Sequence, residues 1–272
     1  MTIHVTDVAI VGGGMVGGAL ALGLAQQGFT VTVLEKVAPP AFDPASAPDV
    51  RISAISAASV GLLKSLGVWD AIRAMRVHAY RRLETWEWES AHVAFDAAEL
   101  KLPELGYMVE NKVLQWGLWQ ALAAHEAVTL RVGSELKTMQ RGETQTALHL
   151  REGETIHARL VIGADGANSQ VREMAGIGVH AWQYQESCML ISVECADDPG
   201  DSTWQQFTPS GPRAFLPLFD HWASLVWYDA PARIRQLQSM TMAQLQQEIA
   251  SHFPARLGRV TPQAAGAFPL TR

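Results

Sequence analysis

We predict an α/β protein of two interleaved parts, a nucleotide-binding βαβ unit with its supporting elements and a mainly antiparallel β-sheet. Three observations lead to this fold class. Residues 8–35 have the pattern of a buried strand, a glycine turn, a helix and a second strand. Residues 156–172 again combine a buried strand, a tight turn and the start of a helix. From residue 187 onward, short segments of alternating apolar residues are separated by turn residues, which favours an antiparallel sheet.

The first strand runs directly into a glycine turn. Gly12, Gly14 and Gly17 fit the spacing G-x-G-x-x-G after the apolar run at 8–11. In such a turn the first glycine permits the tight bend, the second lets the backbone approach a pyrophosphate, and the third lets helix and strand pack closely. The phosphate charge then meets free N–H groups at the start of a helix. With a strand before it and a helix after it, this spacing predicts a Rossmann-like dinucleotide site rather than an ordinary glycine-rich turn.

The second strand, at residues 29–34, ends at Glu35. An acidic residue about 20 positions after the glycine turn accepts hydrogen bonds from the adenosine ribose. Its charge would repel a 2′-phosphate, so the nucleotide is expected to be FAD or NAD and not NADP.

Composition excludes several classes of protein. The 272 residues are 48% hydrophobic and 18% charged, which is enough for one large or two modest domains. A net charge of -6 argues against nucleic-acid binding. We expect neither a signal peptide nor a segment that spans a bilayer. Cys188 and Cys195 match no zinc or redox spacing, so we interpret them as small buried side chains in a reducing compartment.

The remaining elements follow from turn signals and periodicity. The Pro-rich residues 37–50 should be a loop, residues 56–66 a helix closed by Gly67, and residues 112–124 a second helix. Strands are expected at 80–95, 128–132, 135–151, 156–162, 187–195, 203–208, 213–218 and 222–228, with a last helix at 242–253.

A second motif, D-G-x-x-S-x-x-R, is formed by Asp165, Gly166, Ser169 and Arg172. Alone, it is equally well explained as a strand–turn–helix corner with good cap chemistry. Together with the glycine turn, it makes the chain resemble the flavoprotein aromatic hydroxylases, the single-component FAD monooxygenases typified by p-hydroxybenzoate hydroxylase. In that family this segment lies beside the FAD pyrophosphate and is also implicated in pyridine nucleotide binding.

The resemblance extends over essentially the whole chain. It implies that Arg51 lies against the FAD phosphates and that Asn111 is a polar FAD contact. Within the family, residues 51–55, 109–111 and 160–169 resemble the ubiquinone-biosynthesis branch. Residues 80–89, 176–184 and 214–219 resemble its demethoxyubiquinol-hydroxylating members. The implied domains are a discontinuous FAD-binding domain, residues 1–75 and 105–178, and a substrate-binding sheet domain, residues 76–104 and 179–272.

The resemblance also implies the reaction. FAD, with NAD(P)H as the electron donor, would use O2 to hydroxylate the quinol ring of a polyprenylated demethoxyubiquinol, in a pocket that excludes water. Arg213, Phe215 and Pro217 belong to the strand that the family places on the substrate side, and Phe215 and Pro217 share a parity. Plain sheet core is an equally good explanation of both. The apolar tail calls for a wide hydrophobic groove. A cytoplasmic location, with attachment to the inner membrane surface or to a biosynthetic complex, would help to supply such a substrate.

Aromatic and histidine side chains leave alternatives open. The nine tryptophans are explained by packing or, for some, by an apolar substrate cavity. The histidines show no paired metal-ligand spacing, so no metal is expected, and nothing marks a general base, so the catalytic residues stay unassigned.

One departure from the family concerns the C-terminal end. The family continues past a Phe-Pro-Leu-Thr segment into motifs that hold the flavin ribityl chain and ring, whereas this sequence stops at Arg272. We therefore expect the 272 residues alone to retain FAD poorly and to be inactive. Three functions remain open: the quinol hydroxylase or a hydroxylase of another ring position; another flavoenzyme of the same fold, such as an oxidase or a prenyl reductase; and a non-enzymatic scaffold.

Overall fold

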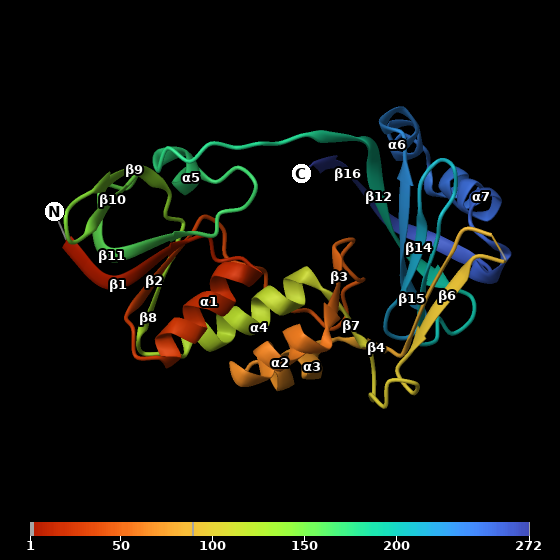
Figure 1. Cartoon of the computed structure of the whole chain (residues 1–272), viewed down its shortest axis with the longest axis horizontal. Helices are drawn as coiled ribbons and strands as arrows, with labels where there is room; N and C mark the ends of the chain where they lie inside the picture. The colour runs from red at the N-terminus through yellow and green to blue at the C-terminus, as the bar shows by residue number, and fades with distance from the viewer. Residues whose placement is uncertain (1–2, 89, 272) are drawn as a thin grey trace. The chain divides into compact units, whose positions relative to one another are not determined.

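The computed structural model describes residues 3–88 and 90–271, and it divides into two compact units. Unit 1 comprises residues 1–42, 62–72 and 112–180, and unit 2 comprises residues 43–61, 73–111 and 181–272. Two of the boundaries between the units fall inside the short helices α2 (Ala57–Ser65) and α3 (Trp69–Met75). Figure 1 shows the elements of both units along the chain.

Unit 1 is built on a six-stranded sheet of order β8-β2-β1-β11-β10-β9. Its strands are β1 (Ile3–Val11), β2 (Val31–Glu35), β8 (Val128–Val132), β9 (Leu136–Arg141), β10 (Thr146–Leu150) and β11 (Thr155–Gly163). The first four in the sheet order are parallel, and β10 and β9 extend the sheet antiparallel. Because parallel strands end at the same edge, Val11, Glu35 and Gly163 are brought together there.

Two helices of unit 1 lie side by side, α1 (Met15–Gln26) and α4 (Asn111–Ala123), as Figure 1 shows. They approach closely because α1 has a glycine at the contact: a Cβ on Gly18 would lie 3.5 Å from Cβ of Leu118. The short helix α5 (Gln170–Met174) follows β11 and buries Val171 in the core of the unit. The sequence therefore folds locally as the glycine turn predicts, with the helix α1 starting where β1 ends.

Unit 2 is built on a seven-stranded sheet of order β16-β12-β15-β14-β13-β5-β6. Its strands are β5 (Arg82–Trp86), β6 (His92–Asp96), β12 (Gln183–Cys195), β13 (Ser202–Gln206), β14 (Arg213–Pro217), β15 (Trp222–Asp229) and β16 (Val260–Thr271). All neighbours are antiparallel except β13 and β5. A small sheet of β3 (Ile52–Ser56), β7 (Gly106–Glu110) and β4 (His78–Tyr80) completes the unit.

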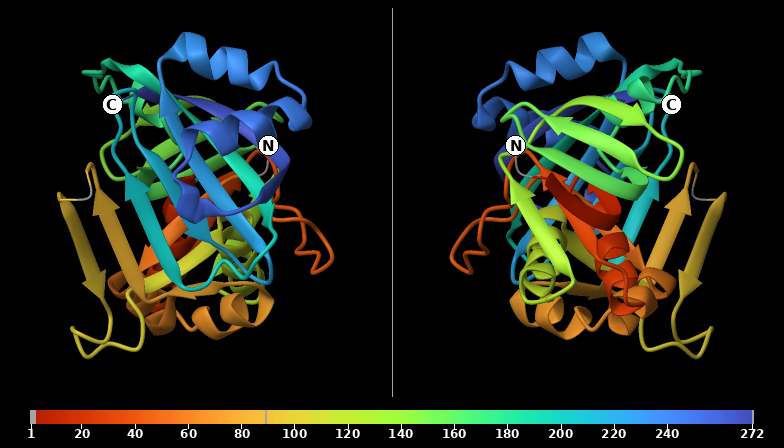
Figure 2. Two further views of the ribbon diagram at one scale, coloured as in Figure 1. Left: turned by 90° about the vertical axis from the view of Figure 1, so that its right-hand side faces the viewer. Right: turned by 90° about the vertical axis from the view of Figure 1, so that its left-hand side faces the viewer.

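One face of the large sheet is covered by α6 (Pro231–Gln238) and α7 (Met242–His252); in the left view of Figure 2, α7 lies in front of the strands and α6 at their upper end. Ile234 and Leu237 of α6 and Leu245 and Ile249 of α7 pack on the sheet in one apolar core. A short 3-10 helix, η1 (Ala255–Leu257), follows α7.

The fold class predicted from the sequence is confirmed: a βαβ nucleotide-binding unit is combined with a mainly antiparallel sheet. The predicted functional domains differ in extent from the compact units, since residues 43–61, 73–75 and 105–111 belong to unit 2 and residues 179–180 to unit 1. A binding domain is defined by its ligand, so those domain limits stay a prediction.

Candidate cofactor and substrate sites

The glycine turn lines a pocket of about 610 Å³ at the edge of the unit 1 sheet. Gly12 and Gly14 come from the turn after β1, Glu35 from the end of β2, and Asp165 and Gly166 from the turn after β11. Lining residues that the sequence analysis did not single out include Lys36, Ser134, Glu135, Asn168 and Gln170. Five predicted cofactor residues are therefore brought to one pocket by three parallel strands.

Glycine is needed at each of the three predicted positions for a different structural reason. Gly12 has φ +103°, and a Cβ there would lie 2.3 Å from the carbonyl oxygen of Ala164. A Cβ on Gly17 would lie 1.9 Å from the carbonyl oxygen of Gly12, so this position closes the contact between helix and turn. A Cβ on Gly14 would meet no atom of the described residues within 4 Å, because this position opens into the pocket. Gly14 is thus the point at which a ligand can touch the backbone.

The start of α1 suits an anion. Gly14 is its N-cap and offers no side chain, and the first turn of the helix contains Met15, Val16 and Gly17. The first N–H groups of a helix have no partner within it, and the helix dipole adds positive potential there. A diphosphate in the pocket would accept hydrogen bonds from these groups. The residues present therefore fit the diphosphate of FAD.

The backbone N–H and carbonyl of Gly13 form hydrogen bonds with three side chains. Its N–H donates to Oε2 of Glu35 at 2.6 Å, and its carbonyl accepts from Nε1 of Trp119 at 2.6 Å and from Nε2 of Gln115 at 3.1 Å. Glu35 also accepts from the N–H of Val37 at 3.1 Å. Gln115 and Trp119 lie one turn apart on α4, so this helix fixes the glycine turn. Sequence reasoning missed both, although a buried indole N–H requires a partner.

The D-G-x-x-S-x-x-R segment combines a pocket wall with a helix cap. Oδ2 of Asp165 accepts from the N–H groups of Gln170 (2.7 Å) and Val171 (3.2 Å), and Oδ1 accepts from the Ser169 hydroxyl. Ser169 accepts from the N–H of Arg172 at 3.1 Å, and Arg172 donates to the carbonyl of Ala167 at 2.9 Å. Asp165 and the glycine after it line the cofactor pocket.

Ser169 and Arg172, by contrast, line a different hollow, which they share with β9 and β11. Their hydrogen bonds are those of an ordinary helix cap. The two residues therefore act as cap residues in this structure, and their contact with FAD stays a prediction.

An ion pair stands at the rim of the cofactor pocket. Nζ of Lys36 lies 2.8 Å from Oε1 of Glu135, and this contact lowers the pKa of Glu135. Both residues are exposed or half-buried and line the pocket beside Glu35. The pair follows two neighbouring strands, β2 and β8, which the sequence alone did not show to be adjacent.

The two FAD contacts implied only by family resemblance lie in unit 2. The guanidinium of Arg51 lies 5.3 Å from the ring centroid of Phe268. Oδ1 of Asn111 accepts from the Ser53 hydroxyl at 2.6 Å, and the backbone N–H of Asn111 donates to the carbonyl of Arg51 at 3.0 Å. Their role toward FAD stays a prediction.

The predicted substrate residue Arg213 is engaged by its own chain. It is 2% exposed, its guanidinium lies 4.7 Å from the ring centroid of Trp227, and Nη2 lies 3.0 Å from Oδ2 of Asp229. It also donates to the carbonyls of Gly211 and Tyr228. Burial lowers its pKa, and the Asp229 carboxylate opposes that shift. Arg213 therefore connects the start of β14 with the end of β15, and its role toward the substrate stays a prediction.

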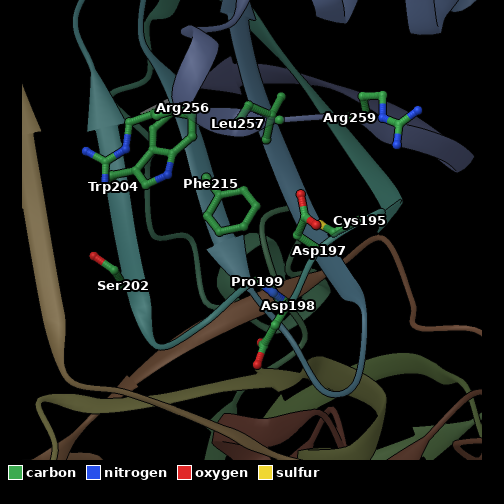
Figure 3. A pocket seen from close by; sticks show the side chains of 11 residues that line it. Cys195, Asp197, Asp198, Pro199, Ser202, Trp204, Phe215, Arg256, Leu257 and Arg259 are labelled. Atoms are coloured by element: carbon green, nitrogen blue, oxygen red, sulfur yellow. The ribbon is translucent and has the colours of Figure 1, made fainter.

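Phe215 lies on the face of the sheet that α6 and α7 cover. Its ring stacks on Trp204, with centroids 5.4 Å apart, inside the core of unit 2. It borders a small pocket of about 190 Å³ with Trp204, Arg256 and Cys195, seen in Figure 3. Pro217 shares its parity and is also buried. Phe215 thus lies in the sheet core, as its alternative explanation has it, and a role of Phe215 and Pro217 toward the substrate stays a prediction.

The opposite face of the same strands carries the larger apolar pocket of unit 2, about 380 Å³. Ala214 and Leu216, the neighbours of Phe215, line it. Tyr80 and Met108 contribute from the small sheet, and burial raises the pKa of Tyr80. Other lining residues are Ala54, Leu83, Glu84, Thr85, Thr203, Trp204, Gln205 and Phe207. The residues of β14 that line this pocket thus lie one position before Phe215 and Pro217, the residues that the sequence predicted.

Comparison with known proteins decides the family. The sequence profile of a family described as FAD binding domain matches residues 5–271. The chain belongs to this FAD-binding family. It is 75% identical over 272 residues to the 3-demethoxyubiquinol 3-hydroxylase of Escherichia coli (strain K12), covering all of this chain and 70% of that protein. It is 35% identical over 260 residues to the ubiquinone hydroxylase UbiL of Rhodospirillum rubrum, covering 95% of this chain and 60% of that protein.

A solved structure shares the fold. The probable FAD-dependent monooxygenase PqsL of Pseudomonas aeruginosa superimposes with a TM-score of 0.77 at 19% identity, covering 96% of this chain and 73% of PqsL. These findings confirm the predicted flavoprotein family, its ubiquinone branch and FAD as the cofactor.

Over residues 3–88 and 90–271, no group of three or more His, Cys, Asp or Glu side chains is arranged to hold a metal ion. In the same part of the chain, no helix has the length and apolar character needed to span a bilayer.

Proposed function

We propose that the protein to which these 272 residues belong is an FAD-dependent monooxygenase that hydroxylates the quinol ring of a polyprenylated demethoxyubiquinol. The observation that carries this proposal is the 75% identity to the E. coli 3-demethoxyubiquinol 3-hydroxylase, which extends over the whole chain. The two pockets support it, because one fits a dinucleotide and the other is apolar. Since the chain spans 70% of that relative, the activity is proposed for the protein of full length.

In this proposal the residues of the chain bind the cofactor and position the substrate, and FAD supplies the redox chemistry when bound. The amides at the start of α1, from Gly14 onward, hold the diphosphate, and Glu35, which accepts from the Gly13 N–H, also accepts from the adenosine ribose. The pocket beside β14 holds the quinol ring, with Ala214 and Leu216 against its face and Tyr80 as a hydroxyl donor. Apolar walls exclude water from the reacting ring.

Further parts of the proposal concern partners and place. NAD(P)H is the proposed electron donor and O2 the oxygen source. Arg51 and Asn111 are proposed to contact FAD. We place the protein in the cytoplasm, at the inner surface of the membrane or in a biosynthetic complex, because its substrate has a membrane-soluble tail.

The test is product analysis on the full-length protein. Purified protein with NAD(P)H and ¹⁸O2 should convert a demethoxyubiquinol to a product that carries one labelled oxygen on the ring. A refolded full-length protein that binds no flavin, or that consumes NAD(P)H without a hydroxylated product, would refute the proposal.

The same assay separates the alternatives. Label at another ring carbon would indicate a hydroxylase of a different position. Hydrogen peroxide as the sole product of O2, with an amine or a hydroxy acid as substrate, would indicate an oxidase. Reduction of a prenyl double bond would indicate a reductase.

A further inference from the structure

The outer edge of the unit 2 sheet has its apolar side chains exposed. Val93 and Phe95 of the edge strand β6 share one face and are 51% and 52% exposed. The other face of β6 carries Ala94 between two paired polar residues: Nε2 of His92 lies 2.9 Å from Glu84, and Asp96 lies 3.3 Å from Arg82. A sheet with one solvated face normally turns its polar residues to water. On β6 the exposed face instead carries two large apolar side chains, and such exposed apolar groups are typical of binding surfaces.

The strand register connects this face with the apolar pocket. Phe95 lies opposite Leu83 on β5, and Val93 lies opposite Thr85. Leu83 in turn lies opposite Thr203 on β13. Leu83, Thr85 and Thr203 all line the 380 Å³ pocket that also contains Leu216. Because side chains directly opposite each other on neighbouring strands are in contact range, the pocket wall continues across β5 to the sheet edge.

The pocket is too small to enclose both the quinol ring and the polyprenyl tail of the substrate. A volume of about 380 Å³ lies near the lower end of what pockets for drug-sized ligands enclose. A quinol ring with a chain of several isoprene units is much larger. A polyisoprenoid chain has no hydrogen-bonding group, so it requires a contiguous apolar path rather than directional partners. Val93 and Phe95 supply such a path from the pocket to the edge.

We propose that the face formed by Leu83, Val93 and Phe95 binds the polyprenyl tail of the substrate where it leaves the ring pocket. This inference rests on the proposed function, and it adds the location of the tail. The ring then lies against β14, and the tail crosses β13 and β5 and leaves the protein over β6.

The experiment compares two substrates on the full-length protein in detergent micelles. One is a polyprenylated demethoxyubiquinol, and the other carries a methyl group in place of the tail. The variants are Val93→Asp and Phe95→Asp, whose side chains are half exposed on an edge strand. The matched control is Val5→Asp on β1, where the valine is 61% exposed in unit 1.

We expect both β6 variants to raise KM for the tailed substrate by about tenfold or more, because a charge replaces apolar contact with the tail. Their kcat and their KM for the tail-less substrate should stay within about twofold of wild type. The control should leave both substrates unchanged. An equal rise in KM for both substrates, or no rise for either, would overturn the tail site.

Two further outcomes would distinguish the tail site from membrane docking and from a failure of the proposed function. A loss seen with substrate in lipid vesicles but absent in micelles would mean that this face docks to the membrane, and the tail site would be wrong. If wild type hydroxylates neither substrate, the proposed function fails, and the tail site is judged by binding of a polyprenyl alcohol, followed by quenching of protein fluorescence. About tenfold weaker binding by the β6 variants then supports the tail site, and equal binding contradicts it.

Discussion

The glycine turn after β1 and the strand β14 were both predicted to face a ligand, and they differ in how their residues are used. In the turn, Gly12 and Gly14 line one large pocket together with Glu35 from the end of β2. In β14, Arg213 is tied to Asp229 and Trp227, and Phe215 is stacked in the core. The neighbours Ala214 and Leu216 face the apolar pocket instead.

The difference teaches which kind of site a sequence can specify. A glycine turn binds through its backbone, so spacing alone fixes which positions meet the ligand. A strand binds through every second side chain, and a shift of one residue reverses its faces. Strand β14 is buried on both faces, so its sequence, Arg-Ala-Phe-Leu-Pro, does not alternate and leaves the parity open.

The largest expected effect tests the core assignment of β14. Phe215→Ala should lower the free energy of unfolding by about 3–5 kcal/mol, because a buried ring stacked on Trp204 is lost. Leu216→Ala, at a half-buried position, should cost less than half of that and should instead weaken substrate binding. Urea unfolding of both variants measures the two losses of unfolding free energy, and hence their ratio. A larger loss for Leu216→Ala would reverse our assignment of the two faces.

The next effect tests the conformation of the glycine turn. Gly12→Ala should destabilise the protein by about 2–4 kcal/mol, because its φ is positive and its Cβ would meet the Ala164 carbonyl at 2.3 Å. Gly28 also has a positive φ but open space, so Gly28→Ala should cost no more than about 1 kcal/mol. Thermal unfolding of the two variants side by side measures the difference. Equal costs would show that the close contact of Gly12 is absent.

A smaller effect tests the clamp on Gly13, by which we mean the hydrogen bonds from Gln115 and Trp119 to its carbonyl. Trp119→Phe removes the indole donor from a buried carbonyl and should cost about 1–2 kcal/mol, leaving only the Gln115 hydrogen bond. We expect FAD affinity of the full-length protein to fall by about tenfold, measured by flavin fluorescence, since 1.4 kcal/mol corresponds to that factor. Trp116→Phe, one residue from Gln115 on α4, is the control and should leave affinity unchanged. Equal affinities for Trp119→Phe and wild type would remove the clamp from the account.

The smallest effect concerns acid stability of the sheet unit. Hydrogen bonds from Arg256, and then from Arg82 and His92, hold the pKa of Glu84 well below its ordinary value, although burial opposes them. A carboxyl with a lowered folded-state pKa stabilises the fold above its ordinary pKa and loses that contribution as pH falls. Wild type should therefore lose stability progressively below about pH 4.3, and Glu84→Gln should show a flatter acid limb. Parallel acid limbs in urea titrations would contradict this role.

The elements were predictable where local pattern and tertiary pairing agree. The predicted helices at 56–66, 112–124 and 242–253 correspond to α2, α4 and α7. The long strand β16 was missed, because Pro262, Gly266 and Pro269 weaken the strand signal and pairing with β12 supplies it. The clamp by Gln115 and Trp119 and the Lys36–Glu135 pair depend on neighbours in space, which one sequence does not show.

The central claim is that the FAD diphosphate binds across the backbone amides at Gly14. The most direct measurement is an FAD titration of the full-length apoprotein, wild type and Gly14→Val, with unfolding curves for both. We predict one FAD per chain for wild type, and at least about 100-fold weaker binding for Gly14→Val with an unchanged unfolding curve, because the new side chain enters the pocket and not the core. Equal FAD affinity in the two proteins would contradict the account.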